Sequence, residues 1–190
     1  MSNEAQDQET NQPPSPAQQD YDEGLELMKK KDYSGAAASF HNALRGFEEA
    51  GEEPGIARAV TKLAEVCLLR EEYAKALEHF RRAREICHRA HDDLSVTYLQ
   101  KQMFYTHIAL QQAREALALG LDLLDIYHDF NNPAGAVEIL EKMAEIHQEN
   151  GEPLKAAESL RTAAAIHKSF KHSRSAQELL NRAEAIARTS

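Results

Sequence analysis

The chain has 190 residues, of which 42% are hydrophobic and only 6% aromatic, with no Trp. This composition favours a core of Ala, Leu, Ile and Met, as in closely packed helices. The formal net charge is −9, but six of the 31 acids and no Lys or Arg fall within residues 1–23, so the remainder holds 25 acids against 22 bases. A nearly neutral folded part argues against a clustered basic face, and we expect neither nucleic acid nor an anionic membrane as partner.

The first residues do not resemble a secretory leader. The segment MSNEAQDQET has neither a basic nor an apolar region, and no 18-residue apolar run that could span a membrane occurs in the chain. Cys67 and Cys87 lie 20 residues apart without a CxxC pair, which is typical of reduced, buried thiols in a cytosolic protein. We therefore expect a cytoplasmic protein without membrane insertion.

Residues 1–16 are rich in Asn, Gln, Ser and Pro and show no apolar periodicity. Such a segment buries too little surface to offset its ordering entropy, so we predict a disordered acidic and polar tail. Its Ser15-Pro16 pair is a candidate phosphorylation site, although such pairs are common in loops by chance. Residues 17–190 are predicted to form one continuous domain, because each unit of a repeat array buries its face on the next.

A 40-residue repeat organises this domain. Four alanines keep the spacing: Ala36, Ala76, Ala116 and Ala156. Polar breaks fall about every 20 residues, and between them the apolar residues follow helical spacing. We predict four antiparallel helix pairs in repeats at about 17–56, 57–96, 97–136 and 137–176, followed by a capping helix at 173–188.

Several residues mark the predicted helix ends. Asp92 or Asp93, Asn132 and Ser173 precede helical runs and are predicted N-caps, since their side chains can accept from free backbone N–H groups. Gly51 and Gly151 suit helix C-termini, where a left-handed residue is common.

The first two repeats resemble the tetratricopeptide repeat (TPR) family, whose pattern combines small residues with aromatic residues at the turn and in the second helix. The matching residues are Gly24, Tyr33, Ala36, Phe40 and Ala43, then Ala64, Tyr73, Ala76, Phe80 and Ala83. A 40-residue period exceeds the usual one of about 34, which resembles the long-repeat branch found in kinesin light chains. The resemblance implies an all-α fold, an α-α superhelix or TPR solenoid, that binds peptides or helices on its concave face.

The third and fourth repeats depart from this pattern. Phe104 replaces the small residue, Gly120 the aromatic residue, Leu123 the alanine, and Pro153 the turn aromatic. Leu121 occupies a position where the other repeats carry His or Arg. It either fills the gap that Gly120 leaves, which we favour, or contributes to a homo-oligomer contact.

In this family the first helix of each pair lines the concave groove. The resemblance assigns partner contacts to these positions: Arg58, Lys62, Glu65, Leu68, Tyr98, Lys101, Tyr105, Ile108, Glu141, Lys142 and Glu145. It also covers Thr61, Gln102, Glu138 and Gln148. Leu68, Tyr98, Tyr105 and Ile108 would form an apolar middle with charges on either side, or would merely pack between neighbouring helices.

The clamp of some family members for the C-terminal carboxylates of chaperones needs Lys, Asn and Arg at five groove positions. The matching residues are Tyr21, Leu25, Lys62, Tyr98 and Gln102. Only Lys62 is basic and none is Asn, so a co-chaperone of this type is not expected.

Catalysis has no candidate residues. The nine histidines are scattered and show no metal-ligand spacing, and no phosphate-binding glycine loop, nucleophile elbow or HExxH motif occurs. We expect no enzyme, cofactor or metal. The leading hypothesis is a protein-interaction scaffold that binds a peptide or helix of another protein. The alternatives are a self-assembling structural protein, with homo-oligomers less favoured, and a peptide-responsive regulatory module.

Overall fold

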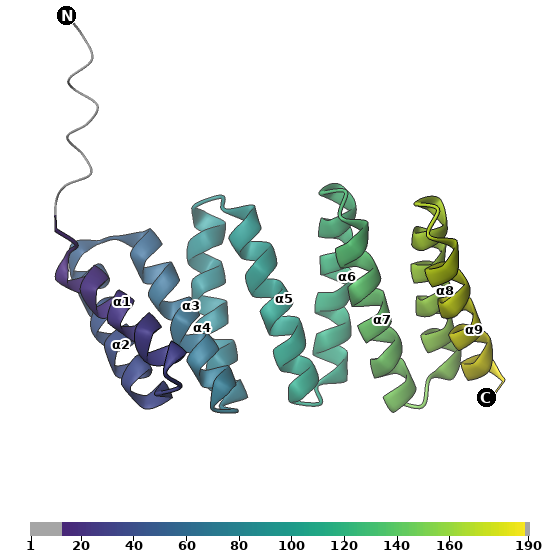
Figure 1. Ribbon diagram of the computed structural model, residues 1–190, viewed down its shortest axis with the longest axis horizontal. Coiled ribbons are helices and arrows are strands. Elements are labelled where there is room, and N and C mark those ends of the chain that lie inside the picture. Colours follow the sequence, from purple (N-terminus) through teal and green to yellow (C-terminus); the bar gives the residue numbers. More distant parts are fainter. Residues whose placement is uncertain (1–12, 189–190) are drawn as a thin grey trace, which may run out of the picture. The chain divides into compact units, whose positions relative to one another are not determined.

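Figure 1 shows a computed structural model of the chain, in which residues 13–188 are described. These residues form nine α-helices and no strand, so the predicted all-α fold is confirmed. The predicted tail at 1–16 lies largely outside the described residues. Its last residue, Pro16, is instead the first residue of helix α1, and the Ser15 Oγ accepts a hydrogen bond from the Gln18 N–H at 3.2 Å.

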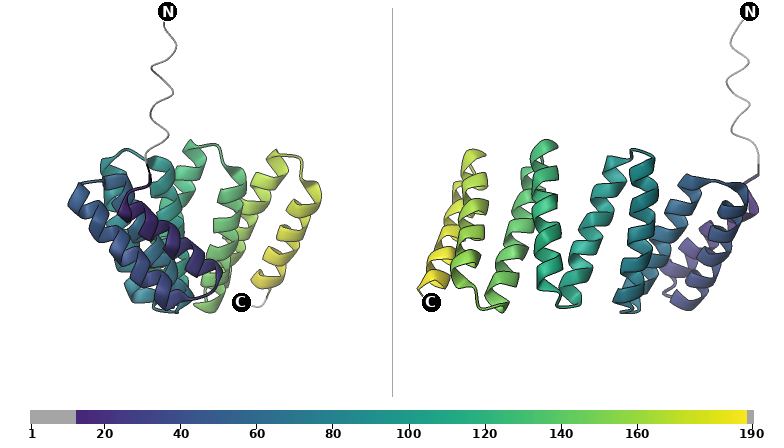
Figure 2. Two further views of the ribbon diagram at one scale, coloured as in Figure 1. Left: turned by 60° about the vertical axis from the view of Figure 1, so that its left-hand side comes forward. Right: turned by 180° about the vertical axis from the view of Figure 1, so that it is seen from behind.

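The chain divides into two compact units, which meet in the sequence between Asp92 and Asp93. The first contains α1 (Pro16–Lys29), α2 (Tyr33–Ala50), α3 (Glu53–Leu69) and α4 (Tyr73–Arg89). The second contains α5 (Asp93–Ala109), α6 (Ala113–Asp129), α7 (Pro133–Glu149), α8 (Pro153–Ser169) and α9 (Ser173–Ala187). Within each unit, every helix packs against the next in antiparallel orientation (Figure 2). The single continuous domain at 17–190 stays a prediction.

Each turn between helices contains one residue with a positive φ, and these residues recur every 20 positions. They are Lys31, Gly51, Glu71, His91, Gln111, Asn131, Gly151 and Lys171. The next N–H in each turn donates to the carbonyl five residues back, as from Asn132 to Tyr127 at 2.7 Å. This is the Schellman arrangement, which satisfies the free carbonyls at a helix end. One helix with its turn therefore measures 20 residues, and two make the 40-residue repeat.

The helix starts follow from these turns. Asn132 is the N-cap of α7, as predicted, and its Oδ1 accepts from the Gly135 N–H at 3.0 Å. The prediction for Ser173 is wrong, because the turn places His172 at the cap and makes Ser173 the first helical residue. Helix α5 begins at Asp93.

The core is built around the recurring alanines, which are fully buried in all four repeats. In the first repeat the bare backbone of Gly24 makes room for Phe40, whose ring would lie 2.6 Å from a Cβ added there. In the third repeat the sizes are reversed: a Cβ on Gly120 would lie 3.2 Å from Phe104 and 3.0 Å from Met143. Two departures from the TPR pattern, Phe104 and Gly120, thus compensate for each other: the first helix of the pair gains the side-chain volume that the second helix loses.

Leu121 does not fill the space beside Gly120, so the favoured prediction for this residue is wrong. Phe104 and Met143 already occupy that space, and Leu121 is 57% exposed. The reason is geometric, since Leu121 follows Gly120 by one residue and therefore points about 100° away from it around the helix.

Both cysteines are free thiols. Cys87 is buried and Cys67 half-buried, and burial raises the pKa of the Cys67 thiol. Between residues 13 and 188, no helix combines the length and the apolar character that crossing a bilayer would require.

Candidate functional site

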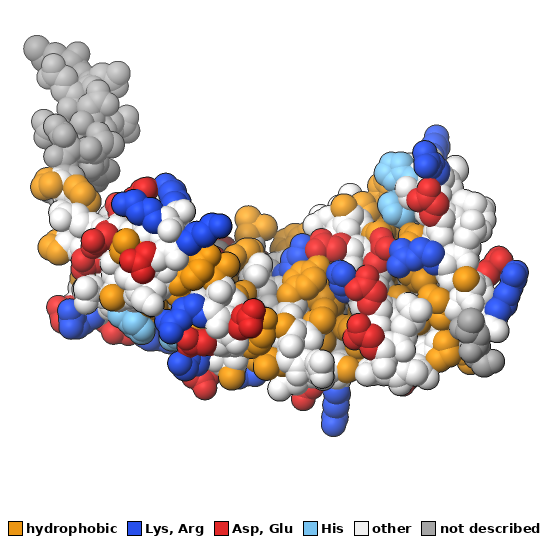
Figure 3. Space-filling view, turned by 60° about the horizontal axis from the view of Figure 1, so that its bottom comes forward, with side chains coloured by type: hydrophobic (Ala, Val, Ile, Leu, Met, Phe, Trp, Pro, Cys, Tyr) orange, Lys and Arg blue, Asp and Glu red, His pale blue; other side chains and the backbone are white. Residues whose placement is uncertain are grey.

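The predicted groove residues lie on the first helices of the repeats, which are α3 in the first unit and α5 and α7 in the second. Over most of the face seen in Figure 3, acidic, basic and hydrophobic side chains lie next to one another. Within each unit, neighbouring first helices are joined by hydrogen bonds or ion pairs.

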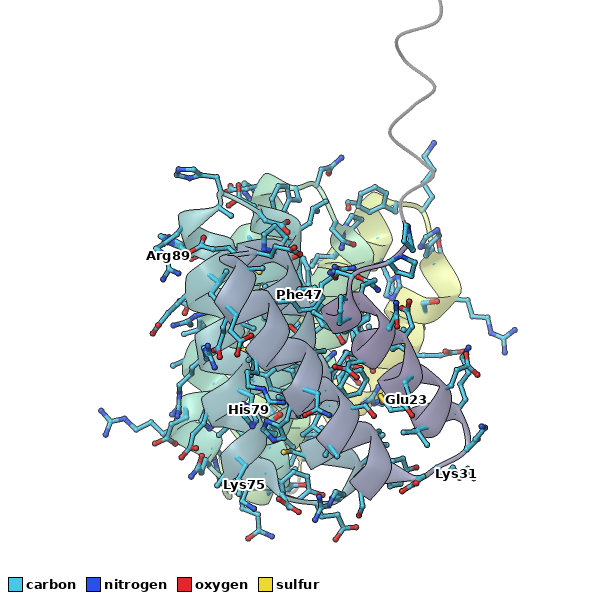
Figure 4. The ribbon with its side chains drawn as sticks, turned by 90° about the vertical axis from the view of Figure 1, so that its left-hand side faces the viewer. Glu23, Lys31, Phe47, Lys75, His79 and Arg89 are labelled. Atoms are coloured by element: carbon cyan, nitrogen blue, oxygen red, sulfur yellow. The ribbon has the colours of Figure 1, made fainter. Side chains whose placement is uncertain are left out.

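In the first unit, Arg58 links α3 to α1. Its Nη2 donates to the Gln18 Oε1 at 3.2 Å, and its guanidinium carbon lies 5.2 Å from the ring centroid of Tyr21. It also lies 5.8 Å from the ring centroid of Phe47, a buried side chain of α2 that Figure 4 labels. Burial raises the pKa of Tyr21, so its hydroxyl stays neutral beside Arg58. Cation–π contacts and one hydrogen bond therefore hold the predicted partner-binding Arg58 against its own chain.

Two further charges of α3 neutralise each other. The Lys62 Nζ lies 2.7 Å from the Glu65 Oε2, one turn away on the same helix face. Both side chains are only about a quarter exposed. Leu68, near the end of the same helix, is half-buried.

In the second unit, Glu138 of α7 is held by two side chains of α5. The Lys101 Nζ lies 2.8 Å from its Oε2, and the Tyr105 hydroxyl donates to its Oε1 at 2.5 Å. Burial alone would raise the pKa of Glu138, but the hydrogen bonds from Lys101 and Tyr105 lower it below its usual range. Burial and the neighbouring carboxylate raise the pKa of Tyr105. The carboxylate is thus ionised and fixed between the two helices.

The same kind of link joins α7 to α9. The Arg182 Nη1 lies 2.6 Å from the Glu141 Oε2, and on α7 itself the Lys142 Nζ lies 2.7 Å from the Glu145 Oε2. The charged groove residues of α7 are therefore all paired within the chain.

Apolar surface remains on α5. Tyr98 is 43% exposed, and Ile108 is half-buried at the other end of the helix. Ile108 lines a cavity of about 430 Å³ where α5 and α7 end. The other lining residues are Gln111, Ala113, Ala116, Ile146, Glu149 and Asn150. This cavity is large enough to admit a side chain of a partner.

The structure thus brings Lys101 and Tyr105 together at Glu138. In the first unit it pairs Lys62 with Glu65 and places Arg58 against Gln18 and Tyr21. Sequence reasoning missed Gln18 and Arg182 as the partners of groove residues. A signal for both was present, because Gln18 and Arg182 occupy the same repeat positions as Arg58 and Lys142. The assignment of these residues to partner binding stays a prediction.

Several histidines stabilise turns. The His107 Nδ1 lies 2.6 Å from the Gln112 Oε1, and the His147 Nδ1 lies 2.7 Å from the Glu152 Oε2. Each pair joins the first and last residues of a Schellman turn. In the part of the chain that the structure describes, no three His, Cys, Asp or Glu side chains converge as a metal site would require.

Comparison with solved structures places this helix arrangement among TPR-like repeat proteins. The apo form of RapI superposes with a TM-score of 0.78 at 18% identity, over 92% of this chain and 49% of RapI. The structure of kinesin light chain nearly identical TPR-like repeats from Podosopora anserina gives a TM-score of 0.63 at 16% identity, over 92% and 97% of the two chains. The Rap conjugation gene regulator of plasmid pLS20, in complex with the Phr* peptide, gives 0.60 at 13% identity, over 100% and 60%.

These identities show a common fold and nothing finer. The chain spans about half the length of RapI. No protein-family profile matches the chain, and no curated protein matches its sequence. The predicted fold of TPR-type helix pairs with a final helix α9 is thereby confirmed.

Proposed function

We propose that the chain is a protein-interaction module without catalytic activity, which binds a peptide or helical segment of another protein on the first helices of its repeats. The observation that carries the proposal is the double link from Lys101 and Tyr105 to Glu138. It holds α5 and α7 in one arrangement before any partner arrives, and a preformed surface loses less entropy on binding.

The paired charges change what this surface selects. Since Lys101, Glu141 and Glu145 already have partners within the chain, a bound segment gains little from opposite charges alone. Affinity comes from apolar anchors near Tyr98 and in the cavity beside Ile108. The preferred segment therefore carries two aliphatic or aromatic residues, with polar residues between them.

A peptide-responsive regulatory module is the second candidate. It is supported by the fold match, over the whole of this chain, to the Rap regulator in complex with the Phr* peptide. The chain spans 60% of that protein, and in this candidate the bound peptide changes how the chain contacts a second protein. Amide hydrogen exchange of a second protein that binds the chain would distinguish this candidate from a simple adaptor. In a regulatory module, adding the peptide should slow the exchange of that second protein.

The test is a screen of a peptide library on the purified chain, followed by titration of the selected peptides against variants. Tyr98→Ala and Tyr105→Ala together are expected to weaken binding while helicity is retained. Tyr105→Phe separates the two roles of this side chain, because it keeps the ring and removes only the hydrogen bond to Glu138.

The matched control is Leu154→Ala, which removes an exposed apolar side chain from the second helix α8. If the selected peptides bind the double tyrosine variant as tightly as the unchanged chain, the first helices are not the binding surface.

A further inference from the structure

The outward faces of α4 and α6 expose the same repeat positions but differ in charge. The α4 face carries four cations and two acids: Lys75, Glu78, Arg81, Arg82, Glu85 and Arg89. The α6 face carries four acids and one base, with two apolar residues between them: Arg114, Glu115, Ala118, Leu121, Asp122, Asp125 and Asp129. Two helices with the same place in the repeat thus present opposite net charge to solvent.

The reversal is concentrated in one row on each helix. Lys75, Arg82 and Arg89 on α4 are replaced on α6 by Glu115, Asp122 and Asp129. A spacing of seven residues is nearly two helical turns, so the three charges of a row lie on one side, about 10.5 Å apart. Figure 4 shows Lys75 and Arg89 near the two ends of α4.

The α6 row is free to accept a partner. The side chains of Glu115 and Asp122, and of Asp125 beside the row, form no hydrogen bond or ion pair with another described residue. The Asp129 side chain has only the adjacent His128, at 3.4 Å. Leu121 lies beside the central Asp122 and is 57% exposed. An apolar side chain flanked by unpaired carboxylates suits a cationic surface with long aliphatic stems.

The α4 row is paired, but only at the surface. Arg82 contacts Glu48, Arg89 lies 3.2 Å from Glu53, and the cations of the row are about half exposed or more. Exposed pairs of this kind contribute little, so a second carboxylate can be added or exchanged at small cost.

We propose that the outward face of α6 binds the outward face of α4 in a second copy of this chain. Arg82 of one copy lies opposite Asp122 of the other, and the stems of Arg81 and Arg82 cover Leu121. The contact joins two different surfaces, so each copy keeps one face open for a further copy unless the assembly closes into a ring.

The other basic outward face, that of α8, fits less well. It carries Lys155 in the equivalent row, but Thr162 and Ser169 stand at the next two places. Only one of three carboxylates on α6 would meet a cation there, whereas α4 supplies all three.

Sedimentation velocity of the unmodified chain tests the association. At about 50 mM salt we expect the average mass to rise above the 21.3 kDa of one chain as concentration increases. At about 500 mM salt it should return towards one chain, because the Debye length then falls below about 5 Å. Concentration-independent monomers at low salt would overturn the proposal.

Charge reversal locates the contact. Asp122→Arg and Arg82→Asp are each expected to weaken association about tenfold or more, and the double variant should recover most of that loss. The pair at 82 and 122 is central in both parallel and antiparallel packing, so recovery does not depend on helix direction. Circular dichroism checks that each variant keeps its helices.

Association that survives both reversals, or that the double variant fails to restore, would overturn the assignment to α4 and α6. A strictly monomeric chain that binds an amphipathic Lys-Leu peptide through Leu121 and Asp122 would instead identify a foreign basic protein as the occupant. Both outcomes are independent of the tyrosine variants that test peptide binding on the first helices.

Discussion

In the first and third repeats, one large and one small residue share the same space between the paired helices, but the two residues have exchanged helices. In the first unit Gly24 lies on α1 and Phe40 on α2, whereas in the second unit Phe104 lies on α5 and Gly120 on α6. Phe40 and Phe104 are both fully buried. The position of the large side chain is thus not fixed by the fold, as long as the opposite helix supplies a small residue.

The two units also link their first helices differently. In the first unit the link between α1 and α3 uses the neutral acceptor Gln18 and the ring of Tyr21. In the second unit the link between α5 and α7 uses the ionised carboxylate of Glu138. Repeats with one backbone geometry can therefore respond differently to mutation, pH and salt.

The largest effect is expected from Phe104→Ala. Removal of this fully buried ring leaves a cavity beside Gly120, which has no side chain to fill it. The free energy of unfolding should therefore fall by about 3–5 kcal/mol. Urea denaturation followed by circular dichroism measures it. Phe170→Ala is the control, because that ring is 49% exposed. A loss for Phe104→Ala no larger than for this control would contradict the packing described.

The exchange of volume itself is tested by a double variant. Gly120→Phe alone should destabilise by about 1–3 kcal/mol, since it forces a second ring against Phe104 and Met143. Combined with Phe104→Ala, it reproduces the Ala64 and Phe80 arrangement of the second repeat. We expect the pair to be less harmful than the sum of the single changes by about 1–3 kcal/mol. Additive losses would show that the two positions do not share one space.

Much of the fold was predictable, because the 40-residue recurrence of alanine reports a packing requirement that every repeat must meet. The polar breaks predicted the number of helices, and the residue type of Asn132 predicted the N-cap of α7. Ser173 has a side chain that suits an N-cap, but the fixed length of the Schellman turns places the cap one residue earlier, at His172.

The surface was less predictable for a physical reason. Whether Lys101 faces a partner or its own chain depends on the distance between neighbouring helices, and that distance is set by core packing rather than by the residues themselves. Gln18 and Arg58 nevertheless occupy the same position in adjacent repeats, which places them side by side on neighbouring first helices. Leu121 was misjudged because one residue along a helix turns a side chain away from the gap beside it.

Helix caps offer an intermediate test, one in each unit. Asp32 and Asn132 both accept from the N–H of a glycine three residues on, at 2.9 and 3.0 Å. Changing either to Ala should cost about 1 kcal/mol of unfolding free energy, with Asp32 slightly more affected because its charge also interacts with the helix dipole. Glu52 is the control, since it occupies the same place without a side-chain cap. Equal losses at all three positions would exclude capping as the cause.

The smallest expected effect is a difference in pH dependence between the link through Glu138 in the second unit and the link through Gln18 in the first. The hydrogen bonds from Lys101 and Tyr105 lower the pKa of Glu138 in the folded chain, against the opposing effect of burial. The stability that this carboxylate contributes is therefore present above its unfolded pKa and is lost as the pH falls through the folded value. The side chain is 43% exposed, so the contribution should stay below about 1 kcal/mol. Glu138→Gln should accordingly flatten the fall in urea midpoint between about pH 5 and pH 3, whereas Gln18→Ala should shift the curve without changing its slope. Parallel curves for the unchanged chain and Glu138→Gln would mean that the link does not depend on the charge of Glu138.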